Sequence, residues 1–417
     1  MTRRVLMLTT FYPPYSFGGD AIDVQLWAGA LARRGSEVTV VHDEDAYTAL
    51  GAEPHPDHRP EPDVEVIGLR SRTGRLGLLL THQTGRPMIH GRTLARLCAE
   101  RQFDTVVFGN VSLVGGPGVL SLCPSAVRVY MAMEHWLVCP THALWRYDGR
   151  PCDERRCLRC TIYHRRPPQL WRYTGLLDRA ARHVDLFVAR SEFSRRKHLE
   201  FGFKSPMVVV PAFVAVPSQS AGPSPHSRPY FLFVGRVESL KGLDDVLPLF
   251  EADRGADLVI AGTGSREGEL RKATSHLPNV RWLGYVPRQH LGAWYGHALA
   301  LVVPSATYET FGLVIAEAFS HGTPVVARSR GPLPELLEWG GGLLFTTANE
   351  LSAALRRLAE QPSVRADLSR QAYTAFLANW SEDAVVPRFL DIIEDVRAKR
   401  NLASQAALEA DIARSPA

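Results

Sequence analysis

The segment "LVVPSATYETFGLVIAEAFSHGTPVVA", residues 301–327, contains the pattern that decides the fold. A β-branched run ends at Pro304, a helical run begins near Phe311 or Gly312, and a second β-branched run covers residues 324–327. A helix between two short strands is typical of a crossover connection, which joins parallel strands. The segment therefore predicts one strand, helix, strand unit of a parallel α/β sheet.

The same alternation recurs along most of the chain. The first half contains strand-like runs at residues 5–10, 37–42, 64–69, 105–109, 127–131 and 186–189, and the second half at 230–235, 257–262, 280–284, 299–304 and 324–327. The pattern is broken by "AVPSQSAGPSPHSRP", which is rich in Pro, Ser and Gly and has no periodicity. Such a composition is typical of a linker between domains.

We therefore expect two α/β domains of the Rossmann type that face each other across a cleft. The expected boundaries are residues 1–213 for the first domain, 214–229 for the linker, 230–382 for the second domain and 383–417 for a C-terminal helix and tail. A cysteine-rich insert occupies about residues 135–165 of the first domain. Open parallel sheets bind ligands at the carboxyl ends of their strands, so the cleft is the expected active site.

Composition narrows the class of protein. The 417 residues include 48 Lys and Arg against 43 Asp and Glu, a formal net charge of +5. Arginine supplies most of the positive charge, without the interleaved aromatic residues expected of a nucleic-acid-binding surface. No apolar run reaches the length of a spanning helix, and the first residues lack a signal-peptide pattern. We expect a cytoplasmic protein with an anionic small-molecule ligand.

Two glutamates in the opening segment are candidate binding residues. Glu309 precedes the expected helix, whereas Glu317 lies inside an apolar run, where burial of an unpaired carboxylate costs several kcal/mol. The first amides of the helix have no partners within it and can hold polar or anionic oxygens. Gly312 lets a ligand approach the backbone closely. Both carboxylates can accept hydrogen bonds from sugar hydroxyls, although two glutamates alone also fit a solvated surface.

Neighbouring segments favour the binding role. Arg236 and Lys241 follow the strand-like run at residues 230–235 and place two cations at the mouth of the expected cleft. Arginine and lysine can neutralise a diphosphate. Gly262 and Gly264 follow the next strand, but their spacing does not complete a dinucleotide fingerprint, and the chain contains no P-loop.

Together these segments resemble the retaining glycosyltransferases of family 4, which have two Rossmann domains in the GT-B arrangement. The resembling segments are Gly18-Gly19, "FVGRVESLKG", "LVIAGTGS", "VRWLGYVP" and "PSATYETFGLVIAEAFSHGTPVVA", the last with its Glu-x7-Glu spacing. The resemblance covers most of the chain and is densest from residue 230 to residue 327. It implies that the second domain holds a nucleotide sugar and the first holds mainly the acceptor.

The resemblance also implies residue roles. Glu317 would bind the ribose, Glu309 would contact the donor sugar, and His135 in "MEHW" would lie near the transferred sugar. The remaining donor-binding residues would be Gly18, Gly19, Arg236, Lys241, Gly262, Gly264, Phe311, Gly312 and Leu313. His135 lies between Glu134 and Trp136, where many relatives have Asp, so a structural histidine is the alternative.

The implied activity is retaining hexosyl transfer from a nucleoside-diphosphate sugar, in particular a UDP-sugar such as UDP-N-acetylglucosamine or UDP-glucose, to a hydroxyl acceptor. The acceptor expected first is a small polar natural product such as an antibiotic intermediate. A cell-surface polysaccharide or glycolipid is an alternative. A nonhydrolysing UDP-sugar epimerase, or a sugar-nucleotide-binding protein without activity, would share the two-domain architecture without needing the Glu-x7-Glu block.

Cysteines and charged stretches outside this block have their own interpretations. No catalytic metal is expected, and the stretch Asp43-Glu44-Asp45 is interpreted as an acidic loop. The cysteines of the insert, Cys139, Cys152, Cys157 and Cys160, predict either a structural zinc site or free thiols. Cys98 and Cys123 are expected to be ordinary buried residues. Residues 165–183 are expected to form a crossover helix, with a membrane-surface helix as the alternative.

Overall fold

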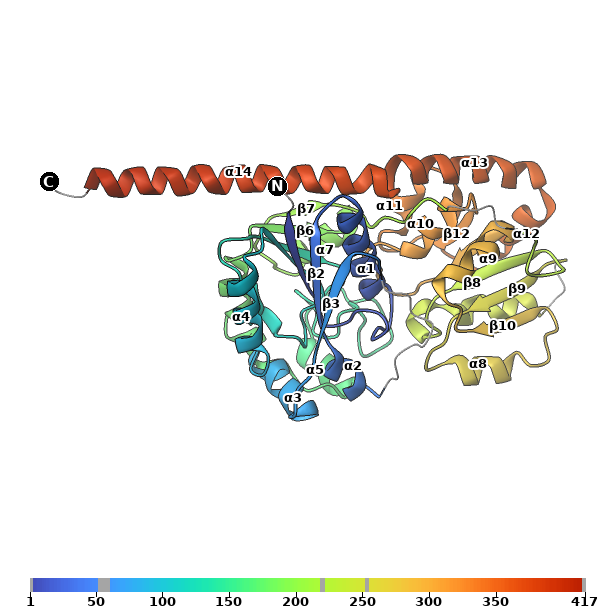
Figure 1. Ribbon diagram of the computed structural model, residues 1–417. Helices are drawn as coiled ribbons and strands as arrows, with labels where there is room; N and C mark the ends of the chain where they lie inside the picture. The colour runs from blue at the N-terminus through green and yellow to red at the C-terminus, as the bar shows by residue number, and fades with distance from the viewer. Residues whose placement is uncertain (1–2, 52–60, 218–221, 252–254, 415–417) are drawn as a thin grey trace.

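The computed structural model describes residues 3–51, 61–217, 222–251 and 255–414. It contains two parallel sheets, each covered by helices, which confirms the predicted pair of Rossmann-like α/β units (Figure 1). Of the expected linker, residues 218–221 lie outside the described residues, and 214–217 and 222–229 contain no helix or strand.

The first sheet has the strand order β3-β2-β1-β4-β5-β6-β7. Its strands are β1 Arg4–Leu8, β2 Glu37–Asp43, β3 Val64–Leu69, β4 Thr105–Phe108, β5 Val127–Ala132, β6 Leu186–Ala189 and β7 Met207–Val209. Its α-helices are α1 Gly19–Arg33, α2 Glu44–Ala49, α3 Gly74–Thr84, α4 Gly91–Arg101, α5 Cys157–Tyr163, α6 Leu176–Ala181 and α7 Glu192–Glu200. Two 3-10 helices, η1 Gly116–Ser121 and η2 Leu170–Tyr173, complete this unit.

The second sheet has the order β10-β9-β8-β11-β12-β13. Its strands are β8 Tyr230–Val234, β9 Asp257–Ala261, β10 Val280–Gly284, β11 Ala300–Val303, β12 Val325–Arg328 and β13 Gly342–Phe345. The α-helices are α8 Glu267–Ala273, α9 Leu291–His297, α10 Leu313–Ser320, α11 Leu333–Leu337, α12 Ala348–Glu360, α13 Pro362–Asn379 and α14 Glu382–Arg414. The 3-10 helices are η3 Ser239–Lys241, η4 Leu243–Asp245, η5 Leu247–Phe250 and η6 Arg288–His290.

Both sheets reverse their winding direction once, between β1 and β4 in the first sheet and between β8 and β11 in the second. Loops that leave two neighbouring strands in opposite directions create a binding position at this point. In the second sheet the loop after β8 carries Arg236 and Lys241, and the loop after β11 carries Glu309. Strand order therefore brings together residues that are about seventy positions apart in the sequence.

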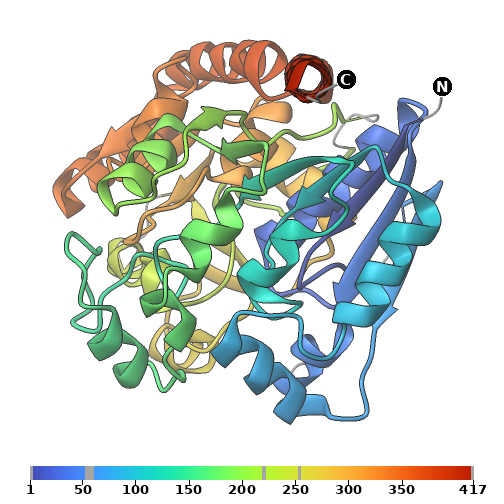
Figure 2. The same ribbon diagram turned by 90° about the vertical axis from the view of Figure 1, so that its left-hand side faces the viewer.

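Helix α14 returns from the second unit and packs on the first. Figure 1 shows it running over the top of the first unit and extending beyond it, and Figure 2 shows it end-on at the top of the molecule. Phe389 is fully buried, and its ring lies 4.6 Å from the ring of Trp27 in α1. Arg33, the last residue of α1, and Arg34, which follows it, form ion pairs with Glu382 at the start of α14.

Four expectations need correction. Residues 401–414 continue α14 rather than forming a tail, because this stretch is rich in Ala and other strong helix formers. Residues 165–183 form η2 and the short α6 instead of one helix, since Gly175 adopts a left-handed conformation between them. Cys98 and Cys123 form a disulfide, which a propensity argument cannot detect. Asp43-Glu44-Asp45 is not a loop, because Asp43 ends β2 and caps α2.

The docking of α14 can be tested with Phe389→Ala. We expect the free energy of unfolding to fall by about 3 kcal/mol, because the substitution removes a fully buried ring and leaves a cavity. Urea denaturation of the full chain measures the change. Leu402→Ala is the matched control, since Leu402 is 67% exposed in the same helix and its loss should change stability by less than about 0.5 kcal/mol. Equal effects of the two substitutions would contradict this account of the docking.

Candidate active site

Glu317 lies in α10 and is almost completely buried, with 8% of its surface exposed. Its two carboxylate oxygens have separate partners. Arg288 donates from Nε to Oε1 at 2.8 Å, and the Tyr295 hydroxyl donates to Oε2 at 2.8 Å. The tyrosine comes from α9 and the arginine from η6, in the connection after β10. The carboxylate inside the apolar run is therefore ion-paired and hydrogen-bonded, and its desolvation is offset.

Glu309 has a different set of partners in the loop after β11. Lys241 Nζ lies 2.6 Å from Oε1, and the Ser305 hydroxyl donates to the same oxygen at 2.7 Å. Burial alone would raise the pKa of Glu309, but the charge of Lys241, the hydrogen bonds from Lys241 and Ser305, and the charge of Arg236 lower it below its usual value. Glu309 is therefore ionised and held in place at neutral pH.

Helix α10 begins beside this ion pair. Gly312 has a φ of +108°, in the left-handed region, and its conformation turns the chain from the loop into the helix. Phe311 is buried in the core of the second unit, so its backbone rather than its ring is available to a ligand. Leu313 packs against the cores of both units. The free amides at the start of this eight-residue helix supply a partial positive charge next to Lys241.

Gly262 and Gly264, which follow β9, allow the backbones of two loops to pack closely against each other. A Cβ atom on Gly262 would lie 1.8 Å from the carbonyl oxygen of Gly235, and one on Gly264 would lie 2.3 Å from that of Val237. The loop after β9 therefore fits directly against the loop that leads to Arg236. The structure gives these glycines a role in shaping the Arg236 loop, and their contact with a donor stays a prediction.

The first unit brings Gly18 and Gly19 to the same place. A Cβ atom on Gly18 would lie 4.0 Å from Arg236 Nε, whereas one on Gly19 would meet nothing within 4 Å. Gly19 begins α1, so its amide is one of the unpaired donors of that helix. The expected diphosphate residues from the two units are thus neighbours.

Other contacts join the carboxyl ends of the two sheets. The Thr310 hydroxyl donates to the carbonyl of Met133 after β5, at 2.9 Å, and the Ser191 hydroxyl after β6 donates to the carbonyl of Thr310 at 2.7 Å. The Glu335 carboxylate accepts from the amides of Glu192 and Phe193 at the start of α7. The two Thr310 bonds hold the Glu309 loop against the first unit, and the Glu335 bonds hold α11 against the start of α7.

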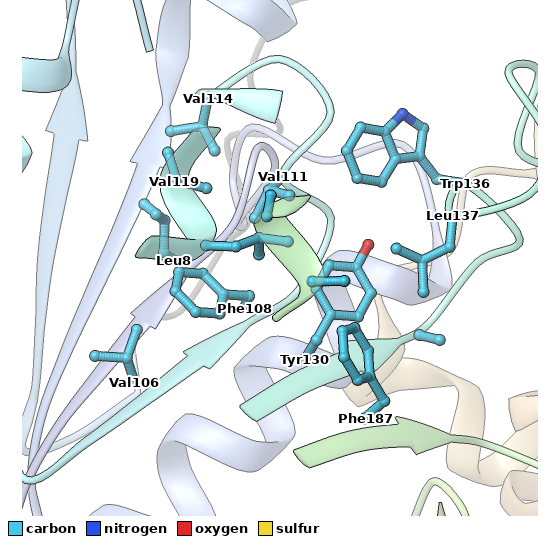
Figure 3. Close-up of a cluster of buried hydrophobic side chains, with 14 of the residues drawn as sticks. Leu8, Val106, Phe108, Val111, Val114, Val119, Tyr130, Trp136, Leu137 and Phe187 are labelled. Carbon is cyan, nitrogen blue, oxygen red and sulfur yellow. The ribbon is translucent and has the colours of Figure 1, made fainter. Parts of the chain in front are cut away.

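His135 follows β5 and is 1% exposed. Its ring stacks on that of His198, with centroids 5.4 Å apart, and its Nε2 has no hydrogen-bond partner. Burial, followed by the charges of His198 and Lys197, lowers the pKa of His135 well below its usual value, so the imidazole is neutral. Trp136 and Leu137, the next two residues, are buried in a hydrophobic cluster that includes side chains of the first sheet (Figure 3). The sugar contact expected of His135 stays a prediction.

Glu134 and His142 form a pair that the sequence interpretation missed. Their side chains meet at 2.5 Å, between Glu134 Oε2 and His142 Nδ1. Burial, with a smaller contribution from Asp20, raises the pKa of Glu134 above its usual value, although His142 and Arg166 act in the opposite direction.

The sequence interpretation also missed Arg288 and Tyr295, the partners of Glu317, although Arg288 directly follows the segment "VRWLGYVP". A single sequence does not show which cation reaches a given carboxylate.

The four insert cysteines lie near one another. Burial, and then electrostatic repulsion by the other three cysteines, raise the pKa of Cys152 to about 12. Cys139, Cys152 and Cys160 are buried, and all four are free. The four sulfur atoms do not, however, provide a group of three ligand atoms within 4.8 Å of one another in the described part of the chain. Zinc at these cysteines therefore stays a prediction.

Comparisons with known proteins agree with this geometry. A model of group 1 glycosyl transferases matches residues 218–375, and a model of glycosyltransferase family 4 matches residues 17–216. Glycogen synthase of Mycobacterium tuberculosis is 27% identical over 406 residues, covering 89% of this chain and 90% of that protein. An uncharacterized 42.6 kDa protein from the cps region of Klebsiella pneumoniae is 23% identical over 350 residues, covering 80% of this chain and 87% of that protein.

Solved structures show the same fold. Sucrose-phosphate synthase from Thermosynechococcus elongatus superposes with a TM-score of 0.69 at 18% identity, covering 95% of this chain and all of that one. HepE of Anabaena in complex with UDP-glucose gives a TM-score of 0.65 at 17% identity, covering 94% and 99% of the two chains. The two family models match the two units of the chain, and each unit contains one parallel sheet. The protein is therefore a glycosyltransferase with the GT-B fold. The chain belongs to glycosyltransferase family 4.

None of the helices in the described residues is long and apolar enough to cross a membrane. The expected cytoplasmic location and the alternative membrane-surface role of residues 165–183 stay predictions.

The ion pair of Glu309 and Lys241 predicts a pH-dependent stability. Because pairing lowers the pKa of Glu309 in the folded state, it stabilises the fold above the unfolded pKa of about 4.3, and this stability is lost as the pH falls through the folded pKa. Lys241→Met should therefore lose about 2 kcal/mol at pH 7 and progressively less below pH 4. Urea denaturation at both pH values measures the difference. Lys272→Met, at an exposed position, is the control, and a loss independent of pH would refute the assignment.

Proposed function

We propose that this glycosyltransferase transfers a hexosyl group, with retention of anomeric configuration, from a UDP-sugar such as UDP-N-acetylglucosamine or UDP-glucose to a hydroxyl acceptor. The observation that carries the proposal is the meeting of two cations, Arg236 and Lys241, with the ionised Glu309 at the start of α10. HepE, which shares the fold, has been crystallised with UDP-glucose and supports the choice of donor.

The positions of the charges suggest how the donor is held. Arg236, Lys241 and the first amides of α10 can bind the diphosphate and stabilise the negative charge that develops on it as the sugar leaves. Lys241 carries three donors, so it can contact a phosphate oxygen while keeping its bond to Glu309. Gly19 would add a main-chain amide from the first unit. No step requires a protein-bound metal.

Glu317 is suited to bind the ribose because its carboxylate is already oriented by the ion pair with Arg288. Ribose hydroxyls would donate to it in bonds that resemble the one from the Tyr295 hydroxyl. Glu309, with the backbone of Phe311, Gly312 and Leu313, would contact the hydroxyls of the donor sugar. Oε2 of Glu309 can still accept hydrogen bonds from the sugar, because Lys241 and Ser305 both donate to Oε1.

For the acceptor we propose a small polar natural product such as an antibiotic intermediate. A second candidate is a cell-surface glycan or glycolipid, which is favoured by the Klebsiella pneumoniae relative from a cps region. Purified full-length protein should be incubated with UDP-, GDP- and ADP-sugars and a panel of both acceptor classes. We expect UDP release that depends on an acceptor, and a product whose anomeric coupling in NMR matches the donor.

Conversion of the donor to another UDP-sugar without any acceptor would instead establish an epimerase. An inverted anomeric centre in the product would contradict retention. UDP binding without turnover on any acceptor class would favour a sugar-nucleotide-binding protein.

The ribose role predicts a binding defect for Glu317→Ala. UDP affinity measured by calorimetry should fall about 10- to 100-fold, the equivalent of one or two charge-assisted hydrogen bonds. The circular dichroism spectrum should be unchanged. Glu338→Ala, which removes an exposed glutamate from the end of α11, should bind UDP as the unmodified protein does. Unchanged UDP affinity in Glu317→Ala would remove Glu317 from the ribose site.

The donor-sugar role predicts a catalytic defect for Glu309→Gln. Turnover should fall about 100- to 1,000-fold, because the neutral amide gives weaker hydrogen bonds and no longer pairs with Lys241. UDP affinity should stay within about threefold, since the ribose contacts are unchanged. Steady-state kinetics and calorimetry separate the two effects. A fully active variant would contradict this role.

A further inference from the structure

A second group of titratable side chains lies at the carboxyl end of β2, in the first unit. Asp43, Asp45 and His90 each place one ligand atom so that the three atoms lie within 4.8 Å of one another. The two aspartates come from the junction of β2 and α2, and His90 immediately precedes α4. None of the three was given a ligand role by the glycosyltransferase resemblance.

Asp43 is the most constrained member of the group. Its side chain is 0% exposed, and its Oδ1 accepts a hydrogen bond from the Ala46 amide at 2.9 Å, which caps α2. Its other oxygen, Oδ2, is buried without a hydrogen-bond partner and lies 3.8 Å from His90 Nε2. A carboxylate oxygen buried in this way carries the full cost of desolvation.

The charges around Asp43 do not offset the free-energy cost of burying its Oδ2. Asp45 and Glu44 place further negative charge next to Asp43, and the hydrogen bonds that help its carboxylate come from the backbone amides of Ala46 and Asp45. Within the described residues no lysine or arginine forms an ion pair with Asp43 or Asp45. The group lacks a positive charge.

We propose that a divalent transition-metal cation binds between Asp43 Oδ2, an Asp45 carboxylate oxygen and the His90 imidazole. Two carboxylates and one imidazole match the ligand preferences of such ions, and the cation would supply the missing positive charge. The Ser71 amide donates to Asp45 Oδ2 at 2.6 Å and fixes the orientation of that carboxylate. Asp45 is half-buried, which leaves an approach from solvent.

The proposed site would link two segments of the first unit. The ion would tie the junction of β2 and α2 to the start of α4, at the same edge of the sheet as the Gly18-Gly19 turn. It is separate from the Arg236, Lys241 and Glu309 cluster, which belongs to the second unit. The inference does not depend on the proposed sugar transfer, and its test uses no sugar.

Manganese is the suitable probe, because thiolates such as those of the insert cysteines prefer softer ions. Full-length protein treated with a chelator and dialysed should be titrated with manganese chloride, with free Mn²⁺ measured by electron paramagnetic resonance. We expect one bound ion per chain and a rise in melting temperature when the ion is added. Asp43→Asn should weaken Mn²⁺ binding at least tenfold and abolish the rise.

Asp43→Asn is chosen because asparagine also caps helices well, so its amide oxygen can replace Oδ1 at the start of α2 and the fold is retained. His90→Ala tests the third ligand and should weaken binding to a similar extent. Asp178→Asn is the matched control, because Asp178 is an exposed aspartate paired with Lys204, and it should bind Mn²⁺ as the unmodified protein does.

Two results would overturn the proposal. One is the absence of stoichiometric Mn²⁺ binding in the unmodified protein. The other is binding that Asp43→Asn and His90→Ala leave unchanged, which would place the ion elsewhere in the chain.

Discussion

The cost of burying a carboxylate governs the carboxyl ends of both sheets. Glu317 is held by a guanidinium and a phenol, Glu309 by an ammonium and a hydroxyl, and Glu134 by an imidazole. Asp43 accepts a hydrogen bond from the Ala46 amide at Oδ1, whereas its Oδ2 is buried without a hydrogen-bond partner. Lys241 and Arg288 come from segments remote from the glutamates that they pair with, so these two ion pairs help to fix the positions of the segments around the site.

Pairing also orients the side chains of Glu309 and Glu317. In the proposed function, a carboxylate that is already oriented would accept a sugar hydroxyl with a smaller loss of rotamer freedom. The contacts between the units act in the same direction. Because Thr310 is bonded to Met133 and Ser191, the Glu309 loop is positioned by the first sheet as well as by its own. The site thus depends on both units, although its charged residues come mainly from one.

Local patterns were sufficient for most of the fold. Eleven strand-like runs correspond to strands, because most of these parallel strands are buried and therefore form short apolar runs. The two strands that were missed, β7 and β13, are short, and β13 begins at the last of three consecutive glycines, which suppress a strand signal. The disulfide of Cys98 and Cys123 was missed because it joins positions 25 residues apart whose proximity depends on packing.

By itself, the sequence determined the two α/β units, the candidate charges Arg236, Lys241, Glu309 and Glu317, and the family resemblance. These features depend on residue type and on short spacings, which are present in the chain before it folds. Only the tertiary structure decided that Lys241 pairs with Glu309, that Arg288 and Tyr295 hold Glu317, and that Asp43 and Asp45 meet His90. Such pairings form between segments that are separate in the chain and become neighbours only when the sheets assemble, because the order of strands in a sheet differs from their order in the chain.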